Sequence, residues 1–159
     1  MAQKQGYSRL RTHRLSIAGA VYMITIITNN RQRVFDTWHA GRPVIAALRR
    51  AETEQHAKTL AWVLMPDHLH WLLVLGDTSL GTLVRRMKGR ATAALRARGL
   101  NHNFWQNGYH DTLLKAPADI YRTARYIIAN PLRAGLVSRV GDYPLWDAKY
   151  WLDGDSDFI

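Results

Sequence analysis

The chain of 159 residues contains no cysteine. Disulfide bonds, thiolate zinc sites and cysteine nucleophiles are therefore excluded. No apolar run approaches the ~20 residues that a helix needs to cross a bilayer, so we expect no membrane partner. Residues 1–14 are polar and basic and lack the apolar stretch of a secretory signal, which favours a cytoplasmic protein.

Acidic residues are few and unevenly placed. Twelve Asp and Glu against 22 Lys and Arg leave a net charge of +10. No acid precedes Asp36, none lies between Asp77 and Asp111, and three of the twelve fall in residues 153–159. Such an excess of positive charge attracts polyanions, and nucleic acid is the leading candidate for the partner.

Hydrophobic patterning predicts an α+β domain in one piece, with a basic N-terminal arm (1–15) and a short acidic tail (153–159). The run 68–75 is apolar on both faces, which is typical of a central strand. The expected order is strand, helix, strand, strand, helix, helix, with room for one more strand, in an antiparallel sheet that helices cover on one face. The expected ranges are 20–28, 43–58, 60–65, 68–75, 79–98 and 119–130, with Pro43 in a first turn and with Ser79 and Asp119 as caps.

His68 and His70 stand at the start of the run 68–75. Residues two apart on a strand point to the same face, so both imidazoles project side by side. Neutral imidazole is a common ligand of divalent metals, and the pair offers two neighbouring coordination positions. The alternative interpretation is a pair of half-buried histidines whose hydrogen bonds are satisfied within the protein.

Tyr126 and Asn130 lie four apart on the last expected helix and so share one of its faces. They fall beside the apolar stripe of Ile120, Ala124 and Ile127, along the edge of the expected contact with the sheet. There they can meet the two histidines. Such a tyrosine indicates a hydroxyl nucleophile, and the amide indicates a third metal ligand. The alternative is an ordinary interfacial tyrosine followed by an asparagine that ends the helix.

Two segments together resemble a known family. Residues 65–73, MPDHLHWLL, resemble the histidine-hydrophobic-histidine strand of HUH endonucleases. Residues 126–137, YIIANPLRAGLV, resemble the tyrosine helix and following turn of REP-associated tyrosine transposases, which are relatives of single-tyrosine insertion-sequence transposases. Residues 19–25, 83–89 and 104–106 add weaker matches, and the resemblance spans roughly residues 10 to 150. The two main motifs are specific in combination and in this order.

The resemblance implies a ferredoxin-like antiparallel sheet packed with helices. It also implies that His68 and His70 bind Mg²⁺ or Mn²⁺, with Asn130 where insertion-sequence relatives often carry glutamine. This substitution keeps an amide oxygen on a shorter arm. Tyr126 would attack a phosphodiester of single-stranded or hairpin DNA, at palindromes of the REP type, to give a 5′-phosphotyrosine and a free 3′-hydroxyl.

The basic residues would then bind the phosphates of the DNA. The protein would act at the nucleoid. Phosphate contacts of this kind position a nucleic acid without reading its bases. The acidic tail is a candidate to cover the basic surface in the free protein. Trp71 and Trp105 are expected in the core rather than as stacking platforms for bases. The candidates for phosphate contacts are Arg9, Arg11 and Arg14 in the arm and Arg85, Arg86, Lys88 and Arg90 on the helix 79–98.

Two other classes compete with a nicking enzyme. One is a catalytically inactive protein that binds DNA hairpins, which retention of both histidines and the tyrosine disfavours. The other is a ferredoxin-like RNA-binding domain, which normally displays aromatic residues on central strands within recognisable motifs that are missing here. The sequence leaves the choice between monomer and homodimer open.

Overall fold

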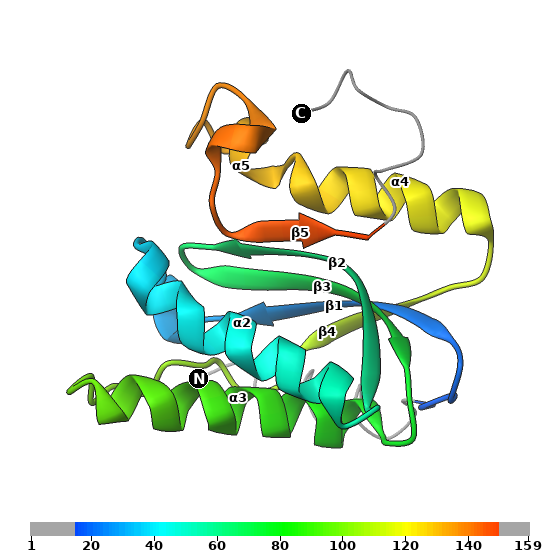
Figure 1. Ribbon diagram of the computed structural model, residues 1–159, viewed down its shortest axis with the longest axis horizontal. Coiled ribbons are helices and arrows are strands. Elements are labelled where there is room, and N and C mark those ends of the chain that lie inside the picture. Colours follow the sequence, from blue (N-terminus) through cyan, green and yellow to red (C-terminus); the bar gives the residue numbers. More distant parts are fainter. Residues whose placement is uncertain (1–14, 150–159) are drawn as a thin grey trace, which may run out of the picture.

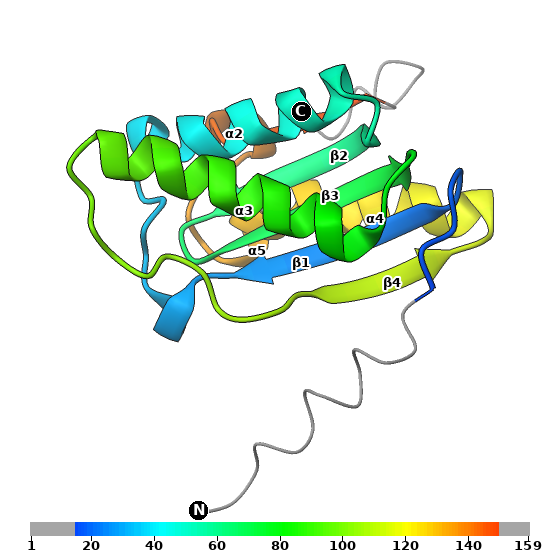
Figure 2. The same cartoon turned by 90° about the horizontal axis from the view of Figure 1, so that it is seen from below.

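The computed structural model describes residues 15–149. They form one antiparallel sheet with the strand order β4-β1-β3-β2-β5. The expected α+β class is therefore confirmed. Helices α2 and α3 cover one face of the sheet, and α4 and α5 lie on the other (Figures 1 and 2). The strands are β1 (Val21–Ile27), β2 (Ala57–Met65), β3 (His68–Leu75), β4 (His110–Leu114) and β5 (Trp146–Ala148).

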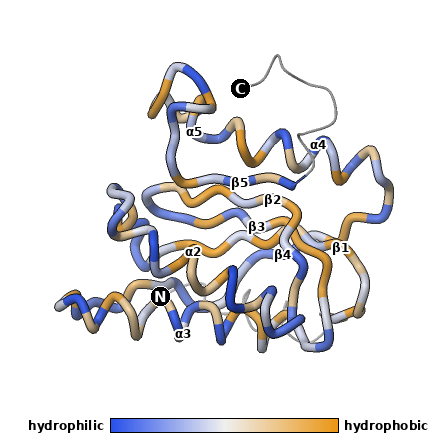
Figure 3. The backbone as a smooth tube through the Cα atoms, viewed as in Figure 1, coloured by the Kyte–Doolittle hydropathy of each residue, from blue (hydrophilic) through white to orange (hydrophobic). Residues whose placement is uncertain are grey.

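The expectation that helices cover only one face of the sheet was wrong. Strand β3 is central and apolar on both faces, as its sequence predicted, so both faces need a cover. Leu69 and Trp71 are buried on the face that α2 and α3 cover, whereas Leu72 is buried on the other face. The apolar stripe of α4 (Pro117–Ile128) covers that second face. Figure 3 shows the hydrophobic colouring running along β2 and β3, between the two helical layers.

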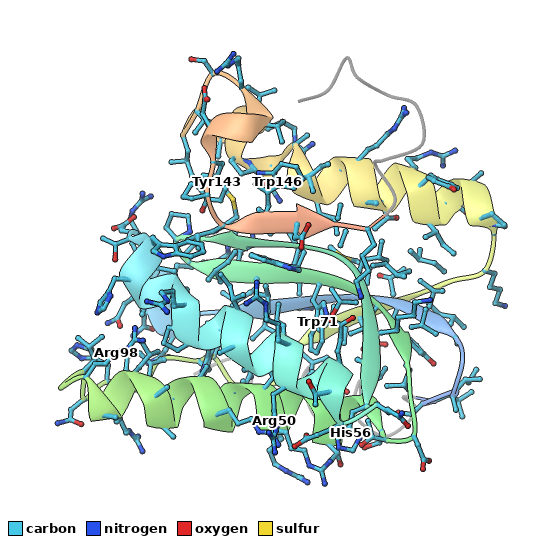
Figure 4. The ribbon with its side chains drawn as sticks, in the orientation of Figure 1. Arg50, His56, Trp71, Arg98, Tyr143 and Trp146 are labelled. Carbon is cyan, nitrogen blue, oxygen red and sulfur yellow. The ribbon has the colours of Figure 1, made fainter. Side chains whose placement is uncertain are left out.

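Helix α2 (Trp38–Thr53) begins earlier than expected, so placing Pro43 in the first turn was wrong. Thr37 caps the helix and accepts a hydrogen bond from the Ala40 amide at 3.2 Å. Pro43 has no N–H to donate to the carbonyl of His39 four residues earlier. Arg98, at the end of α3, donates to that carbonyl instead at 2.6 Å (Figure 4). The arginine thereby satisfies the group that the proline leaves without its helical partner.

The bounds and caps of the other helices agree only in part with those predicted from the sequence. Helix α3 (Leu80–Ala97) begins after Ser79, whose hydroxyl accepts from the Thr82 amide, as predicted. Helix α4 starts at Pro117, so Asp119 lies in its first turn and is not its cap. A separate helix α5 (Asn130–Arg133) follows, with Ala129 as the joint between the two helices. Two 3-10 turns, η1 (Asn29–Arg31) and η2 (Val140–Asp142), complete the elements. In residues 15–149 no helix is long and apolar enough to cross a membrane.

Thr28 ties the corner between β2 and β3 to the end of β1. Its side chain is fully buried. Its amide donates to the carbonyl of Asp67 at 2.9 Å, and its hydroxyl faces the carbonyls of Asp67 and Gln32 at 2.9 and 2.8 Å. These bonds hold the corner in the register that sets His68 opposite Ile27 on β1.

Replacing Thr28 with valine keeps the shape of the side chain but removes its hydroxyl donor. We expect Thr28→Val to lower the free energy of unfolding by about 1–3 kcal/mol, because the buried hydroxyl no longer donates its proton to the carbonyls of Asp67 and Gln32. Urea denaturation measures this change. Thr112→Val, at an exposed position on β4, is the control and should stay within about 0.5 kcal/mol. Equal effects of the two substitutions would contradict the role given to Thr28.

Candidate active site

The two histidines of β3 lie side by side on the face of the sheet that α4 covers. Their ring centroids are 4.7 Å apart, with the ring planes at 76°. Leu69 between them points to the opposite face and is fully buried. The alternation of the strand therefore places both imidazoles on one face, as the sequence predicted.

A neighbouring polar group holds each imidazole through its Nδ1 atom. The Nδ1 of His68 lies 2.7 Å from a carboxylate oxygen of Asp67, which accepts a hydrogen bond from it. The Nδ1 of His70 lies 2.9 Å from the hydroxyl of Thr25 on β1. Histidines that bind metals are commonly held in this way, with the second ring nitrogen left to the metal. Within residues 15–149 neither Nε2 makes a hydrogen bond, so both remain available to a ligand.

The electrostatics of the pair favour a neutral His70. Burial, followed by the charges of His68, Arg133 and Arg31, lowers the pKa of His70 to about 3. Burial raises the pKa of Asp67, but the hydrogen bond to His68 and the charges of His68 and Arg31 outweigh it, so the net pKa is lowered. Asp67 is thus held as a carboxylate, and His70 keeps a free lone pair at neutral pH.

Tyr126 approaches the histidines from α4. Its ring centroid lies 6.5 Å from that of His70, with the planes at 62°. Ala124 and Ile127 bury the helix against the sheet, while 55% of Tyr126 remains exposed. The helix therefore packs by its apolar stripe and leaves the tyrosine at the edge of the contact, open to a substrate on one side and beside His70 on the other.

Arg133, which sequence reasoning missed, completes this cluster. Its guanidinium carbon lies 4.0 Å from the centroid of the Tyr126 ring, in a cation–π arrangement. Its Nη2 also donates to the backbone carbonyl of Tyr126 at 2.7 Å. The same positive charge contributes to the lowered pKa of His70. The only available signal was its place on the turn after Asn130, inside the motif that resembles transposases.

Asn130 lies on a different helix from the one expected. It is the first residue of α5 and is half-buried, and the helix break at Ala129 separates it from the helix of Tyr126. In the described residues its side chain makes no hydrogen bond to either imidazole. Across 15–149 no three His, Cys, Asp or Glu side chains are arranged so that together they could hold a metal ion. Two imidazoles do not complete the coordination of a hard divalent cation, which also needs oxygen ligands such as water, an amide or a phosphate.

Most cations of α3 contact the protein itself. Arg86 donates to the Nε2 of His56 at 2.6 Å (His56 is labelled in Figure 4), and Arg90 donates to Glu54, the residue that caps the end of α2, at 2.8 Å. The ammonium of Lys88 donates to two backbone carbonyls of the loop before β4. Arg85 is exposed and alone of the four makes no hydrogen bond or ion pair within residues 15–149.

Several expectations concern other parts of the chain. Arg9, Arg11, Arg14 and the acidic tail lie outside the described residues. Trp71 is fully buried and donates to Thr59 at 3.0 Å, and Trp105 is only 7% exposed. The expectation that both tryptophans belong to the core is confirmed.

The family model described as "Transposase IS200 like" matches residues 16–130. The chain therefore belongs to the IS200-like transposases, a family of enzymes that cleave and rejoin DNA. It is similar to the REP-associated tyrosine transposase of Escherichia coli (strain K12), at 28% identity over 134 residues, 82% of this chain and 78% of the relative. It is also similar to a solved REP-associated tyrosine transposase bound to a REP hairpin. That match has a TM-score of 0.72 and 26% identity, over 86% of this chain and 81% of the other. The resemblance found in the sequence is confirmed.

The lowered pKa of His70 predicts a specific pH dependence. The unfolded chain takes up a proton on this residue near its ordinary pKa of 6.5, whereas the folded chain does so only near 3. Stability from the neutral imidazole is therefore complete above pH 6.5 and falls as the pH drops toward 3, by at most about 1.4 kcal/mol per pH unit.

Denaturation in chelator at several pH values measures this slope. His70→Asn should flatten it, and His39→Asn, at an exposed position, should leave it in place. NMR of the imidazole should show His70 neutral down to about pH 4. Titration of His70 near pH 6.5 would contradict the buried, neutral state described here.

Proposed function

We propose that this protein nicks and rejoins single-stranded DNA beside hairpins of the REP type, with Tyr126 as the nucleophile. The observation that carries the proposal is the placement of Tyr126 beside His70 and His68, on one face of the sheet. Family membership supports the reaction class. The solved relative that holds a REP hairpin supports the choice of substrate.

The reaction is a phosphoryl transfer in two reversible steps. The hydroxyl oxygen of Tyr126 forms a bond to phosphorus as the bond from phosphorus to the 3′ oxygen breaks. The tyrosine proton is given up, and the departing 3′ oxygen takes up a proton to become a hydroxyl. The 5′ phosphate stays on the tyrosine until the 3′-hydroxyl of the same or another strand attacks it. The ester keeps the energy of the broken bond, so rejoining needs no further energy source.

His68, His70 and Asn130 would hold a divalent ion, Mg²⁺ or Mn²⁺. When bound, the ion polarises phosphoryl oxygens and offsets the negative charge that accumulates in the reaction. The histidines fit this role because Asp67 and Thr25 occupy their Nδ1 atoms and leave each Nε2 free. Asn130 offers an amide oxygen from the start of α5, and its role as a ligand is part of the proposal.

Arg133 would act on the nucleophile and the phosphate together. Its contact with the ring and the backbone of Tyr126 holds the exposed side chain in place. Its guanidinium is also a strong partner for a phosphate oxygen, because its donors match that geometry in pairs. The residue is therefore suited to orient the tyrosine before attack and to stabilise the phosphotyrosine after it.

The alternative to a nicking enzyme is an inactive protein that only binds hairpins, and it would be expected to have lost some of the catalytic residues. Both histidines, their polar partners and an accessible tyrosine are in place together, which favours the enzyme. We further propose that the protein acts in the cytoplasm, at the nucleoid, where its DNA substrate lies.

Tyr126→Phe should abolish a covalent protein–DNA adduct. The assay incubates the protein and Mn²⁺ with labelled single-stranded hairpins from repeats that flank its own gene, followed by a denaturing gel. Tyr121→Phe is a matched control, because Tyr121 lies on the same helix with 54% exposure against 55% for Tyr126. The wild type and Tyr121→Phe should form the adduct, and chelator should remove it. Tight hairpin binding with no adduct in the wild type would favour the inactive binder.

Mn²⁺ titration of the free protein tests the proposed ligands separately from catalysis. His70→Ala should lose Mn²⁺ binding, and Asn130→Ala should weaken it about tenfold. Asn130→Asp should restore the affinity, because a carboxylate also supplies an oxygen ligand. Asn101→Ala, an exposed asparagine in a loop, is the control. Wild-type affinity in Asn130→Ala, with loss in His70→Ala, would remove Asn130 from the ligand set.

A further inference from the structure

Arg31 lies at the end of the site opposite to Tyr126. Its Nη1 atom is 3.5 Å from one carboxylate oxygen of Asp67, and the other oxygen of Asp67 is 2.7 Å from the Nδ1 atom of His68. A single carboxylate therefore separates the guanidinium from the His68 imidazole. Besides burial, which is the main cause, the charge of Arg31 also lowers the pKa of His70, so the arginine acts on both imidazoles. Nothing in the proposed reaction uses it.

The backbone that carries Arg31 is strained. The amide of Gln32 donates to the carbonyl of Asn29 at 3.2 Å, which closes a tight turn. The two central residues of this turn, Asn30 and Arg31, both have a φ of 53°. Where both central residues have a positive φ, asparagine is favoured at the first position and glycine at the second. Residues held in such strained conformations are concentrated at functional sites, so an arginine at the glycine position points to a function of its side chain.

The turn is fixed relative to the histidine pair. The amide of Arg31 donates to the carbonyl of Thr28 at 3.1 Å, and the amide of Asn29 donates to the carbonyl of Phe104 at 2.9 Å. Thr28 also holds the backbone of Asp67 through its amide and its hydroxyl. The same buried threonine therefore positions both the arginine and the carboxylate that lies between it and the imidazoles.

The guanidinium of Arg31 is accessible to a substrate. Its side chain is 60% exposed, and the contact with Asp67 at 3.5 Å is long for a hydrogen bond. Within residues 15–149 the guanidinium makes no other hydrogen bond. A guanidinium carries five N–H donors in a fixed planar fork, so most of them remain available to an oxygen of the DNA.

The expected direction of the reaction places Arg31 on the side of the departing oxygen. Five side chains follow one another across the site, each paired with the next: Tyr126, His70, His68, Asp67 and Arg31. In phosphoryl transfer the attacking and departing oxygens lie on opposite sides of phosphorus. A phosphate above the imidazoles, attacked from the tyrosine end of this series, would release its 3′ oxygen toward the end where Arg31 lies.

We propose that Arg31 stabilises the departing 3′ oxygen of the cleaved strand and holds the resulting 3′-hydroxyl in place for rejoining. The inference rests on the proposed function, because it takes Tyr126 as the nucleophile. As the bond from phosphorus to the 3′ oxygen breaks, the guanidinium donates a hydrogen bond to that oxygen and offsets its developing negative charge. The oxygen takes its proton from solvent, since an arginine stays charged. The two arginines of the site then have separate roles, with Arg133 beside the attacking oxygen and Arg31 beside the departing one.

A hairpin substrate with sulfur in place of the bridging 3′ oxygen at the cleaved phosphate tests this role. A thiolate leaves more readily than an alkoxide and needs less stabilisation, so the sulfur should bypass Arg31. With the normal substrate and Mn²⁺, Arg31→Gln should slow formation of the covalent adduct about 100-fold. With the sulfur substrate, most of this loss should disappear. An equal loss on both substrates, or no loss on either, would overturn the proposal.

Arg33→Gln is the matched control for this substitution. Arg33 follows the same turn and is also 60% exposed, but its guanidinium is paired with Asp36 at 2.9 Å. Its charge is not among the causes that, after burial, lower the pKa of His70. The variant should form the adduct at the wild-type rate on both substrates. A loss equal to that of Arg31→Gln would mean that any cation in this region is sufficient, and would overturn the specific role of Arg31.

Arg31→Gly separates a role in the reaction from a role in folding. Glycine adopts a positive φ without strain, so the midpoint of urea denaturation should stay the same or rise, whereas adduct formation should slow as in Arg31→Gln. A lower midpoint would show that the arginine supports the turn and would overturn the proposal. An adduct that forms at the wild-type rate in both Arg31 variants refutes the role of Arg31 alone. If the wild type forms no adduct on either substrate, the nicking reaction is refuted and the role of Arg31 with it.

Discussion

The register of β3 is the constraint on which the site depends. Side chains alternate along a strand, so a slip of one residue would turn both His68 and His70 into the core under α2 and α3 and bring Leu69 to the face that α4 covers. Two features prevent the slip. Leu69 and Trp71 fill the core under α2 and α3, and Thr28 fixes the β2–β3 corner through Asp67. The carboxylate of Asp67 also holds His68, so the residue whose backbone carbonyl fixes the corner also orients a candidate ligand.

The helix layer that carries Tyr126 is a consequence of the composition of β3. A central strand that is apolar on both faces needs a second cover, and α4 supplies it with Ala124, Ile127 and Ile128. Packing by this stripe leaves Tyr126 at the margin of the contact, beside His70 and still accessible. Arg133 then reaches back from α5 to the tyrosine. The proposed nucleophile is therefore placed by ordinary core packing, and Arg133 contacts its ring and its backbone carbonyl.

Long, periodic segments were predictable from the sequence, and short or context-dependent ones were not. Strand β3 and helix α3 carry strong patterns, so their faces and the Ser79 cap were foreseen. Strand β5 has three residues, and β4 lies partly exposed at an edge, so neither shows a clear period. Pro43 looked like a helix start because a proline inside a helix leaves a carbonyl without its donor. The sequence does not show that Arg98 donates a hydrogen bond to that carbonyl, which belongs to His39. In the site, the partners Thr25 and Arg133 depend on contacts between elements, which no local pattern records.

The most direct test of this account is to identify the residue that carries the DNA. A hairpin adduct formed with Mn²⁺ would be digested with nuclease and trypsin and examined by mass spectrometry. Trypsin releases Tyr126 in the peptide 126–133 and Tyr121 in the peptide 116–122, so the two exposed tyrosines of α4 are separated. The account predicts a nucleotide phosphate on the peptide 126–133. The same modification on the peptide 116–122, or on any other, would contradict it.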